Sequence, residues 1–232
     1  MEFQGFSKNT LGFFNGLKRN NTREWYDDHK AEYMTAVLQP AKAFVVDFGM
    51  KLRTLMPDVV AVPKVNKSLF RINRDTRFSP DKSPYKTNLG ILFWEGRGPR
   101  MECSSVYVHL EPPKNFMLGV GLYMFSRSLL VRYRRAVADP ETGGELAEIV
   151  RKIKNIKNVT LGGRHYKRAP AGFDAGPGNQ QLLLHNGLYA GLENDIPEEF
   201  YSRELIDFCF RAVKPLLPLH RWLVDLTAGK MG

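Results

Sequence analysis

The hydrophobic period of the chain changes twice, and this change limits its fold more than any other feature. Between residues 10 and 56, apolar side chains recur about every three to four positions, as on one face of a helix. From residue 59 to residue 125 they alternate with polar ones, as on a half-buried strand. After residue 125 the helical spacing returns. The sequence therefore places a sheet between two helical parts.

The N-terminal part, residues 6–57, is expected to be helical. Leu11 and Phe14 mark the apolar face of a first helix. Thr22 can cap a second helix, because its hydroxyl can accept from backbone N–H groups left without partners in the first turn. Pro40 is predicted to interrupt the helical pattern and to begin a third helix.

The central part, residues 59–125, is expected to form the sheet. Its strands are predicted near four segments: Phe70–Asn73, Leu89–Trp94, Ser104–Leu110 and Phe116–Met124. Clusters of Pro, Gly and Asp separate these segments and supply short turns, which favour antiparallel pairing. No helical pattern lies between the strands, so a parallel sheet with crossover helices is not expected.

The C-terminal part, residues 126–232, is expected to combine helices with a long loop. We predict helices near 129–137, 143–155 and 198–226, a loop rich in Gly and Pro from Thr160 to Asn179, and a short strand near Leu182–Leu184. The sequence as a whole predicts one α+β domain spanning 1–232. In it, a central antiparallel β-meander is packed by N-terminal and C-terminal helices.

Composition places the chain among ordinary globular proteins. Hydrophobic residues make up 43% and charged residues 25%, which argues against disorder. No apolar run approaches the roughly 20 residues that cross a bilayer, and the first residues lack a secretory signal pattern. The two cysteines cannot build a disulfide framework. We expect a reduced, cytoplasmic protein without membrane attachment; the oligomeric state is left open.

Positive charge is concentrated in one short stretch. The chain carries 34 Lys and Arg against 24 Asp and Glu, a net charge of +10. Residues 64–86 hold seven cations and two carboxylates, 7 − 2 = +5: Lys64, Lys67, Arg71, Arg74, Arg77, Lys82 and Lys86 against Asp75 and Asp81. Half of the net charge therefore lies in about a tenth of the length.

Strand geometry suggests what these cations do. If residues 70–78 are extended, Arg71 and Arg77 share one face with Asp75, whereas Arg74 lies on the apolar face. A guanidinium there needs a carboxylate from elsewhere or a bound anion. Arginine is suited to the second role, because its planar fork grips phosphate or carboxylate with two hydrogen bonds.

The residues that follow extend this site. Pro80 and Pro84 fix turn geometry and deliver Tyr85 and Lys86 to the mouth of the next strand. We predict a cationic cup with the phenol at its rim and with Asp75 and Asp81 orienting the cations. The predicted ligand is a phosphate-bearing anion, a nucleotide or a nucleic acid, and the predicted ligand-binding residues are Arg71, Arg74, Arg77, Lys82, Tyr85 and Lys86.

Two other interpretations of the same residues stay open. In the first, the protein is an enzyme acting on a phosphorylated or carboxylated substrate, with Asp75 or His185 as acid or base and Tyr85 and Lys86 as electrostatic stabilisers. In the second, it is a structural or interaction module whose Arg and Asp side chains only lock the sheet.

Motifs for known cofactors and nucleophiles are missing from the sequence. The five histidines lack metal-ligand spacing, and neither cysteine has an adjacent histidine or basic residue. There is no Walker lysine loop, and Gly119-x-Gly121 is too short for a dinucleotide fingerprint. We predict no cofactor and no metal. A catalytic role for His109 or His185 is the less common outcome for such histidines.

Three stretches together resemble a known family. They are Asn20–Trp25 with Tyr33; Phe70–Ser79 followed by Asp81–Thr87; and Ala169–Phe173. The chain resembles the family of uncharacterised proteins called domain of unknown function 2461, from about Phe6 to Leu219. The resemblance implies a single domain and no established activity. Relatives often carry His-Pro after the third stretch, whereas this chain has Gly176-Pro177, so a catalytic histidine at that point is not expected here.

Overall fold

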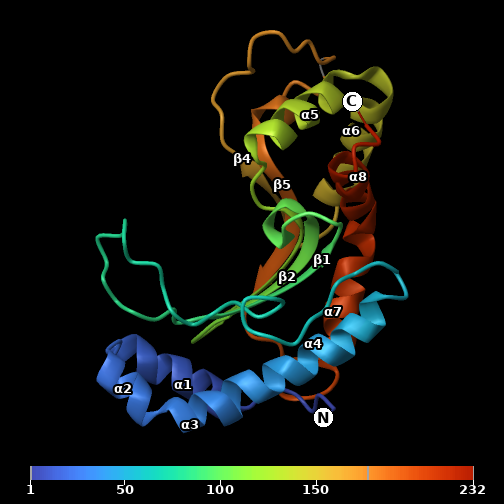
Figure 1. Ribbon diagram of the computed structural model, residues 1–232. Helices are drawn as coiled ribbons and strands as arrows, with labels where there is room; N and C mark the ends of the chain where they lie inside the picture. The colour runs from blue at the N-terminus through green and yellow to red at the C-terminus, as the bar shows by residue number, and fades with distance from the viewer. Residues whose placement is uncertain (1, 177, 232) are drawn as a thin grey trace. The chain divides into compact units, whose positions relative to one another are not determined.

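The fold is built on a five-stranded antiparallel sheet with the strand order β1-β2-β3-β5-β4. The computed structural model describes residues 2–176 and 178–231 (Figure 1). The strands are β1 Leu89–Glu95, β2 Ser104–Glu111, β3 Asn115–Leu122, β4 Val159–Arg164 and β5 His185–Asn194. The first three are joined in sequence order, as a meander. The predicted α+β class and three of the predicted strands are therefore confirmed.

The described residues fall into two compact units. The first contains the chain up to Phe93 together with Tyr107–Leu118 and Glu193–Arg211. The second contains Trp94–Val106, Gly119–Leu192 and the chain from Ala212 onward.

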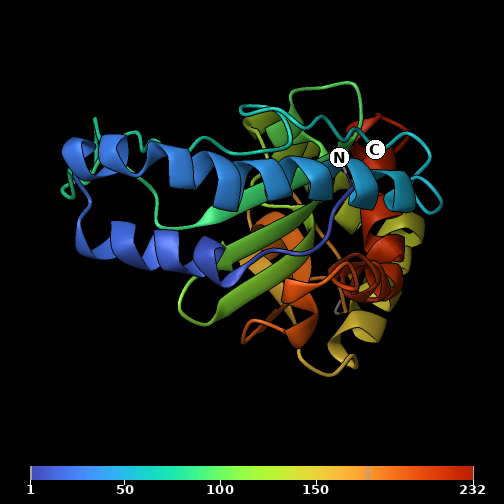
Figure 2. The same ribbon diagram turned by 90° about the horizontal axis from the view of Figure 1, so that it is seen from below.

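The N-terminal helices lie in the first unit. They are α1 Lys8–Arg19, α2 Arg23–Asp28, α3 Lys30–Glu32, the π-helical turn η1 Tyr33–Leu38 and α4 Gln39–Leu52. The Ser7 hydroxyl caps α1, and the Thr22 hydroxyl accepts from the Trp25 N–H at 3.2 Å, as predicted. Figures 1 and 2 show α1 alongside the long helical rod formed by α3, η1 and α4. Buried aromatic rings fill this unit's core, among them Phe3, Phe13, Phe14, Phe44 and Phe48.

The predicted interruption at Pro40 is wrong, because the helical rod continues through it, but α4 does begin beside Pro40, at Gln39, as predicted. Proline has no N–H to donate to the carbonyl four residues earlier, which belongs to Ala36. The buried Thr10 hydroxyl donates to that carbonyl instead, at 2.7 Å. The π-helical turn before α4 also changes the local bonding, with the Gln39 N–H bonded to the Met34 carbonyl. Pro40 therefore lies in the first turn of α4 without ending the rod.

The second unit contains the remaining helices around a buried aromatic pair. They are α5 Arg127–Ala138, α6 Pro140–Lys154 and α8 Leu217–Thr227, and the chain reaches α8 from α7 Leu205–Val213 through a short 3-10 turn. The Tyr133 hydroxyl donates to the Leu182 carbonyl at 2.9 Å, and the Trp222 indole donates to the Thr142 carbonyl at 3.1 Å. Both polar groups are thereby satisfied within an apolar core.

Two predictions for the second unit are wrong. Strand β4 occupies part of the stretch predicted as a loop, and Leu182–Leu184 is a 3-10 helix that precedes β5. The sequence did not predict β4 because this strand contains Gly162 and Gly163, and glycine is more common in loops than in strands. Gly163 has a φ of +95° at an irregularity in the β4–β5 pairing. The sequence analysis noted that Gly176-Pro177 stands where relatives often carry His-Pro. Pro177 lies outside the described residues.

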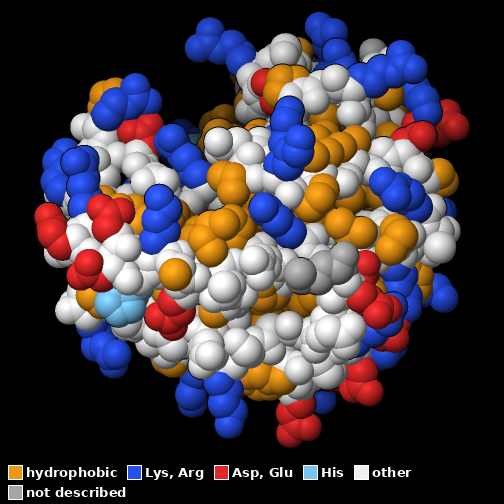
Figure 3. Space-filling view, turned by 60° about the horizontal axis from the view of Figure 1, so that its bottom comes forward, with side chains coloured by type: hydrophobic (Ala, Val, Ile, Leu, Met, Phe, Trp, Pro, Cys, Tyr) orange, Lys and Arg blue, Asp and Glu red, His pale blue; other side chains and the backbone are white. Residues whose placement is uncertain are grey.

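The described helices do not include a membrane-spanning candidate. None of those within 2–176 and 178–231 has the length and apolar character that crossing a bilayer requires. In a space-filling view, Lys and Arg side chains are spread among apolar patches on the face drawn (Figure 3).

Candidate anion-binding site

The stretch from Lys64 to Asn88, called the basic segment below, forms a loop with two arms. The Arg74 N–H donates to the Pro84 carbonyl at 2.9 Å, and the Lys86 N–H donates to the Ile72 carbonyl at 2.8 Å. Between these bonds, Asn73 and Tyr85 make an isolated antiparallel bridge. The predicted strand at Phe70–Asn73 is wrong, because this pairing is too short for a ladder. Figure 1 shows the segment as a long loop preceding β1.

Tyr85 is held by two residues of the helical part of the first unit. The Asn21 side chain donates to the Tyr85 carbonyl at 2.9 Å and accepts from the Tyr85 N–H at 3.0 Å. The ring stacks on Tyr26, with centroids 4.3 Å apart. Burial is the main cause that raises the pKa of the Tyr85 phenol. Tyr85 thus anchors one arm of the loop. The prediction that its phenol lies at the rim of a cationic cup is wrong, because the Tyr85 side chain is buried.

Arg74 has a carboxylate partner from elsewhere in the segment, as its predicted position requires. Its guanidinium forms an ion pair with Asp81 and donates to the Ser83 carbonyl at 3.3 Å and the Ser79 hydroxyl at 3.4 Å. Asp81 in turn accepts from the Ser83 hydroxyl at 2.6 Å and the Ser83 N–H at 2.9 Å. These two hydrogen bonds, followed by that from Arg74, lower the pKa of Asp81 to about 2. The guanidinium is held in a fixed orientation.

Asp75 orients Arg77 through a bidentate contact. The Arg77 Nε and Nη2 atoms lie 3.0 and 2.7 Å from the two Asp75 oxygens. Hydrogen bonds from the Arg77 side chain and backbone lower the pKa of Asp75 to about 2. Both side chains are exposed, so this pair contributes little to stability. Each of the two predicted carboxylates is thus paired with an arginine, Asp75 with Arg77 and Asp81 with Arg74.

The two lysines of the site donate to backbone carbonyls. The Lys82 ammonium donates to the Thr76 carbonyl at 2.9 Å, and the Lys86 ammonium donates to the Arg71 carbonyl at 3.1 Å. Lys86 also lies over the Phe70 ring, 5.5 Å from its centroid. These contacts hold both ammonium groups in place, and the Arg71 side chain is exposed.

A hollow of about 430 Å³ opens beside these groups, and it is called the basic hollow below. Its volume lies in the range of about 300–1,000 Å³ that small-molecule sites occupy. Arg74, Asp75 and Lys86 line it, whereas the other predicted site residues do not. The complete lining consists of Phe70, Arg74, Asp75, Lys86, Asn88, Tyr107 and His109.

Tyr107 and His109 reach the hollow from β2, where alternate residues share one face. The Tyr107 hydroxyl lies 3.1 Å from His109 Nδ1, and His109 Nε2 lies 3.6 Å from a Glu111 oxygen. Burial, followed by the charge of Glu111, raises the pKa of Tyr107 to about 12. The phenol therefore keeps its proton near neutral pH and can donate to Nδ1. The sequence analysis did not predict this group of three residues. The spacing Tyr-x-His-x-Glu on a predicted strand could have indicated it, because alternate residues of a strand share one face.

Comparison with known families gives the same grouping as the sequence motifs. A model of the conserved hypothetical proteins called DUF2461 matches residues 9–222. The chain belongs to this family. No curated protein matches the chain.

His185 of this DUF2461 protein is buried in the second unit, at the start of β5. Its Nδ1 atom lies 3.2 Å from the Leu182 carbonyl. Burial lowers the pKa of its imidazole. Within the described part of the chain, no three His, Cys, Asp or Glu side chains are grouped so that they could hold a metal ion.

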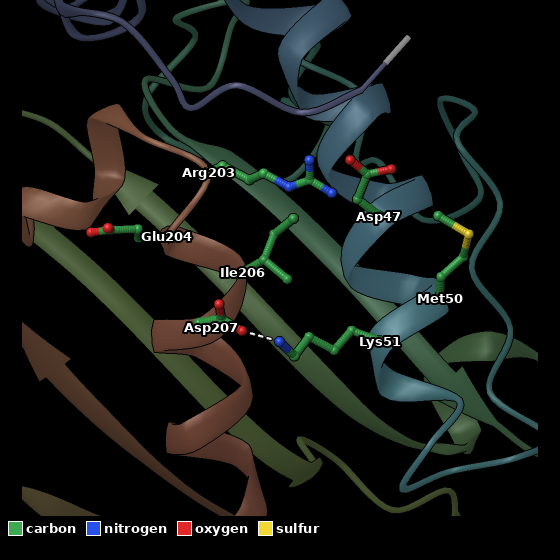
Figure 4. A pocket seen from close by; sticks show the side chains of 7 residues that line it. All are labelled: Asp47, Met50, Lys51, Arg203, Glu204, Ile206 and Asp207. Atoms are coloured by element: carbon green, nitrogen blue, oxygen red, sulfur yellow. Dashed lines mark hydrogen bonds and ion pairs between the residues drawn. The ribbon is translucent and has the colours of Figure 1, made fainter.

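A second hollow lies between α4 and the residues around the start of α7 (Figure 4). It measures about 520 Å³ and is lined by Asp47, Met50, Lys51, Arg203, Glu204, Ile206 and Asp207. Lys51 forms an ion pair with Asp207, and Arg203 forms one with Glu2 outside the lining. Two cations against three carboxylates give 2 − 3 = −1, so this hollow does not favour an anion.

Ser104, His220 and Glu95 form a hydrogen-bonded chain in the second unit of the DUF2461 protein. The Ser104 hydroxyl lies 2.8 Å from His220 Nδ1, and His220 Nε2 lies 2.8 Å from a Glu95 oxygen. The order resembles a hydrolase triad. However, Ser104 is 0% exposed and His220 is 1% exposed, so a substrate cannot reach the hydroxyl. We interpret the chain as structural.

Proposed function

We propose that this DUF2461 protein binds a phosphate-bearing anion, a nucleotide or a strand of nucleic acid, in the basic hollow. The observation that carries the proposal is that Arg74 and Lys86 line one hollow within a segment whose net charge is +5 between residues 64 and 86. Phosphate binding commonly uses a fixed guanidinium together with a point-charged ammonium.

Neutral donors complete the proposed site. Asn88 and His109 can each present an N–H group to phosphate oxygens, and Tyr107 can present its O–H group when that group does not donate to His109. Asp75 also lines the hollow, and its negative charge would oppose an anion. The bidentate contact from Arg77 offsets that charge. The proposed binding groups are therefore Arg74, Lys86 and these neutral donors.

A titration with a nucleoside triphosphate and with a single-stranded oligonucleotide tests the proposal. Lys86→Ala should weaken binding at least about tenfold, because a charge-assisted hydrogen bond contributes about 1.5–3 kcal/mol. Lys82→Ala is the matched control, since Lys82 is an exposed lysine bonded to a carbonyl and lies outside the lining. Equal losses in the two variants, or no binding by the unaltered protein, would refute the proposal.

The salt dependence of binding gives an independent measurement. Each phosphate that a cation neutralises contributes a slope of about −0.7 to −0.9 to log K against log salt. Between about 50 mM and about 200 mM salt, Lys86→Ala should lower the magnitude of this slope by about 0.7 to 0.9, which is the contribution of one phosphate contact. An unchanged slope would mean that Lys86 does not contact phosphate.

A specific observation also favours an enzyme acting on a phosphorylated substrate. Tyr107, His109 and Glu111 form a chain that ends at the hollow, and such a chain can hold an imidazole for proton transfer. His109 suits this role better than the two predicted candidates: Asp75 has a pKa of about 2, and His185 is buried. Phosphate release from a generic aryl phosphate, lost in His109→Ala while binding persists, would support an enzyme. If the protein releases no phosphate, the enzyme hypothesis is refuted and the binding function is the one that remains.

A further inference from the structure

His109 is the histidine among the lining residues of the basic hollow. An imidazole ordinarily titrates between about pH 5 and pH 8. The ammonium and guanidinium in the lining stay positive in this range, and Asp75, with a pKa of about 2, stays negative. Arg74, Lys86 and Asp75 together give 2 − 1 = +1 with a neutral imidazole, and 3 − 1 = +2 with an imidazolium.

Each ring nitrogen of His109 faces an oxygen, and the oxygen that faces Nδ1 lies within hydrogen-bond distance. Glu111 lies 3.6 Å from Nε2, and the Tyr107 oxygen lies 3.1 Å from Nδ1. With a neutral ring, the Tyr107 O–H can donate to Nδ1. With an imidazolium, Nδ1–H donates to the Tyr107 oxygen instead. The hydroxyl hydrogen of Tyr107 must then point elsewhere, and the hollow lies beside it.

Protonation of His109 would therefore change the hollow in two ways that favour an anion. It adds a positive charge and makes the Tyr107 O–H available as a donor. In the absence of an anion, the lining cations Arg74 and Lys86 oppose the added charge, while Glu111 and Asp75 favour it. A bound anion offsets the opposition from the cations. By thermodynamic linkage, the proton and the anion then strengthen each other's binding.

We propose that the basic hollow binds its phosphate-bearing ligand together with one proton, which is taken up by His109. The ligand class is an oxyanion ester, a phosphate monoester or diester. This inference rests on the proposed function, because it assumes that the hollow binds an anion. It adds His109 as a binding residue and Tyr107 as the donor that becomes available on protonation.

The test uses a ligand that does not titrate in the range of interest. An oligothymidylate of about twelve nucleotides without terminal phosphates is suitable, because its diester charge is constant between about pH 5.5 and pH 8.5, where histidine titrates. At constant ionic strength, the affinity of the full-length protein should rise on acidification by up to about tenfold per pH unit, the limit for one linked proton. Calorimetry in two buffers of different ionisation enthalpy should show proton uptake.

Three variants separate the groups involved. His109→Asn should flatten the pH profile and remove the proton uptake. Tyr107→Phe should keep the uptake but lose affinity mainly at low pH, where its O–H is expected to contact the ligand. His165→Asn is the control, since His165 is an exposed histidine of the second unit, and it should leave the profile unchanged.

Each result has a definite meaning. No binding at any pH would refute the proposed function and this inference with it. Binding that is independent of pH, or a profile that His109→Asn leaves intact, would refute the inference alone. If His109→Asn fails to fold, the His109 ring proton can be followed by NMR in the unaltered protein. Its titration midpoint should move to higher pH when the ligand is added, and an unmoved midpoint would refute the inference.

Discussion

The side-chain amide of Asn21 bonds both backbone groups of Tyr85, donating to the carbonyl at 2.9 Å and accepting from the N–H at 3.0 Å. An asparagine side chain has the same donor and acceptor pair as a peptide group, so Asn21 acts as a one-residue strand partner. It joins the start of α2 to the basic segment. These are the two stretches on which the family resemblance mainly rests, and the structure places them in contact.

Asn21→Ala is expected to destabilise the protein and to loosen the basic segment. Two partly buried backbone groups would lose their partner, which costs about 1–3 kcal/mol of unfolding free energy. Chemical denaturation should show this loss, and hydrogen exchange should accelerate at the Tyr85 amide. Asn9→Ala serves as the control, because Asn9 is exposed on α1 and should change stability little. Unchanged exchange at Tyr85 in Asn21→Ala would contradict the assigned role.

Acidification is expected to loosen the basic segment through Asp81. Its pKa in the folded protein is about 2, below the ordinary value of 3.8. A carboxyl with a lowered pKa stabilises the fold above the ordinary pKa, and that contribution is lost as the pH falls through the folded value. The window is therefore about pH 4 to about pH 2. A carbon-13 NMR titration should place the Asp81 midpoint near 2.

Asp81→Asn should remove this pH response. The variant lacks the titrating carboxyl, so hydrogen exchange in the basic segment should be faster at neutral pH and should change less between about pH 4 and pH 2. Asp58→Asn is the matched control, because Asp58 is exposed and lies outside the segment. A midpoint near 3.8 for Asp81 would show that its contacts with Ser83 and Arg74 do not persist in solution.

The chain of Ser104, His220 and Glu95 is expected to stabilise the second unit. Ser104→Ala would leave His220 Nδ1 buried without its partner, at a cost of about 1–3 kcal/mol of unfolding free energy. Ser105→Ala gives the comparison, because its half-buried hydroxyl bonds the Gly121 carbonyl and its loss should cost less. Thermal unfolding would measure both. If Ser104→Ala melts like the unaltered protein, the chain is not structural.

Local patterns predicted the fold well where the partners are close in sequence. The Thr22 cap bonds the Trp25 N–H three residues away, and the alternation in β2 places Tyr107 and His109 on one face. Where the partner is distant, sequence reasoning failed. Pro40 was expected to interrupt the helix because nothing local indicates that Thr10 satisfies the carbonyl of Ala36.

The sequence predicted only the part of the candidate site whose residues are close together in the chain. Asp75 with Arg77 and Asp81 with Arg74 are pairs within the basic segment; the sequence predicted that these two carboxylates orient the cations but did not identify the pairs. His109 belongs to another strand, and only the tertiary fold brings it to the same hollow as Lys86. Its alternation with Tyr107 was visible in the sequence, but the register of β2 against the segment was not.

Gly90→Ala is expected to disturb the hollow through Tyr107. Gly90 lies in β1, and a Cβ there would approach the Tyr107 hydroxyl oxygen to 2.7 Å and Phe70 Cδ2 to 3.2 Å. The Tyr107 ring must move, so its contact with His109 should weaken, and overpacking should cost about 1–3 kcal/mol of unfolding free energy. Gly119→Ala is the matched strand control, because its Cβ would meet nothing closer than 3.9 Å.

The Gly90 prediction can be separated from general damage to β1 by a double variant. Tyr107→Phe removes the hydroxyl oxygen that the new methyl group would approach most closely. The destabilisation by Gly90→Ala should therefore be smaller in a Tyr107→Phe background, giving a coupling energy of about 0.5–3 kcal/mol by chemical denaturation. Additive losses would mean that the methyl group acts on the strand backbone or on Phe70, and that Tyr107 does not occupy the position assigned to it beside His109.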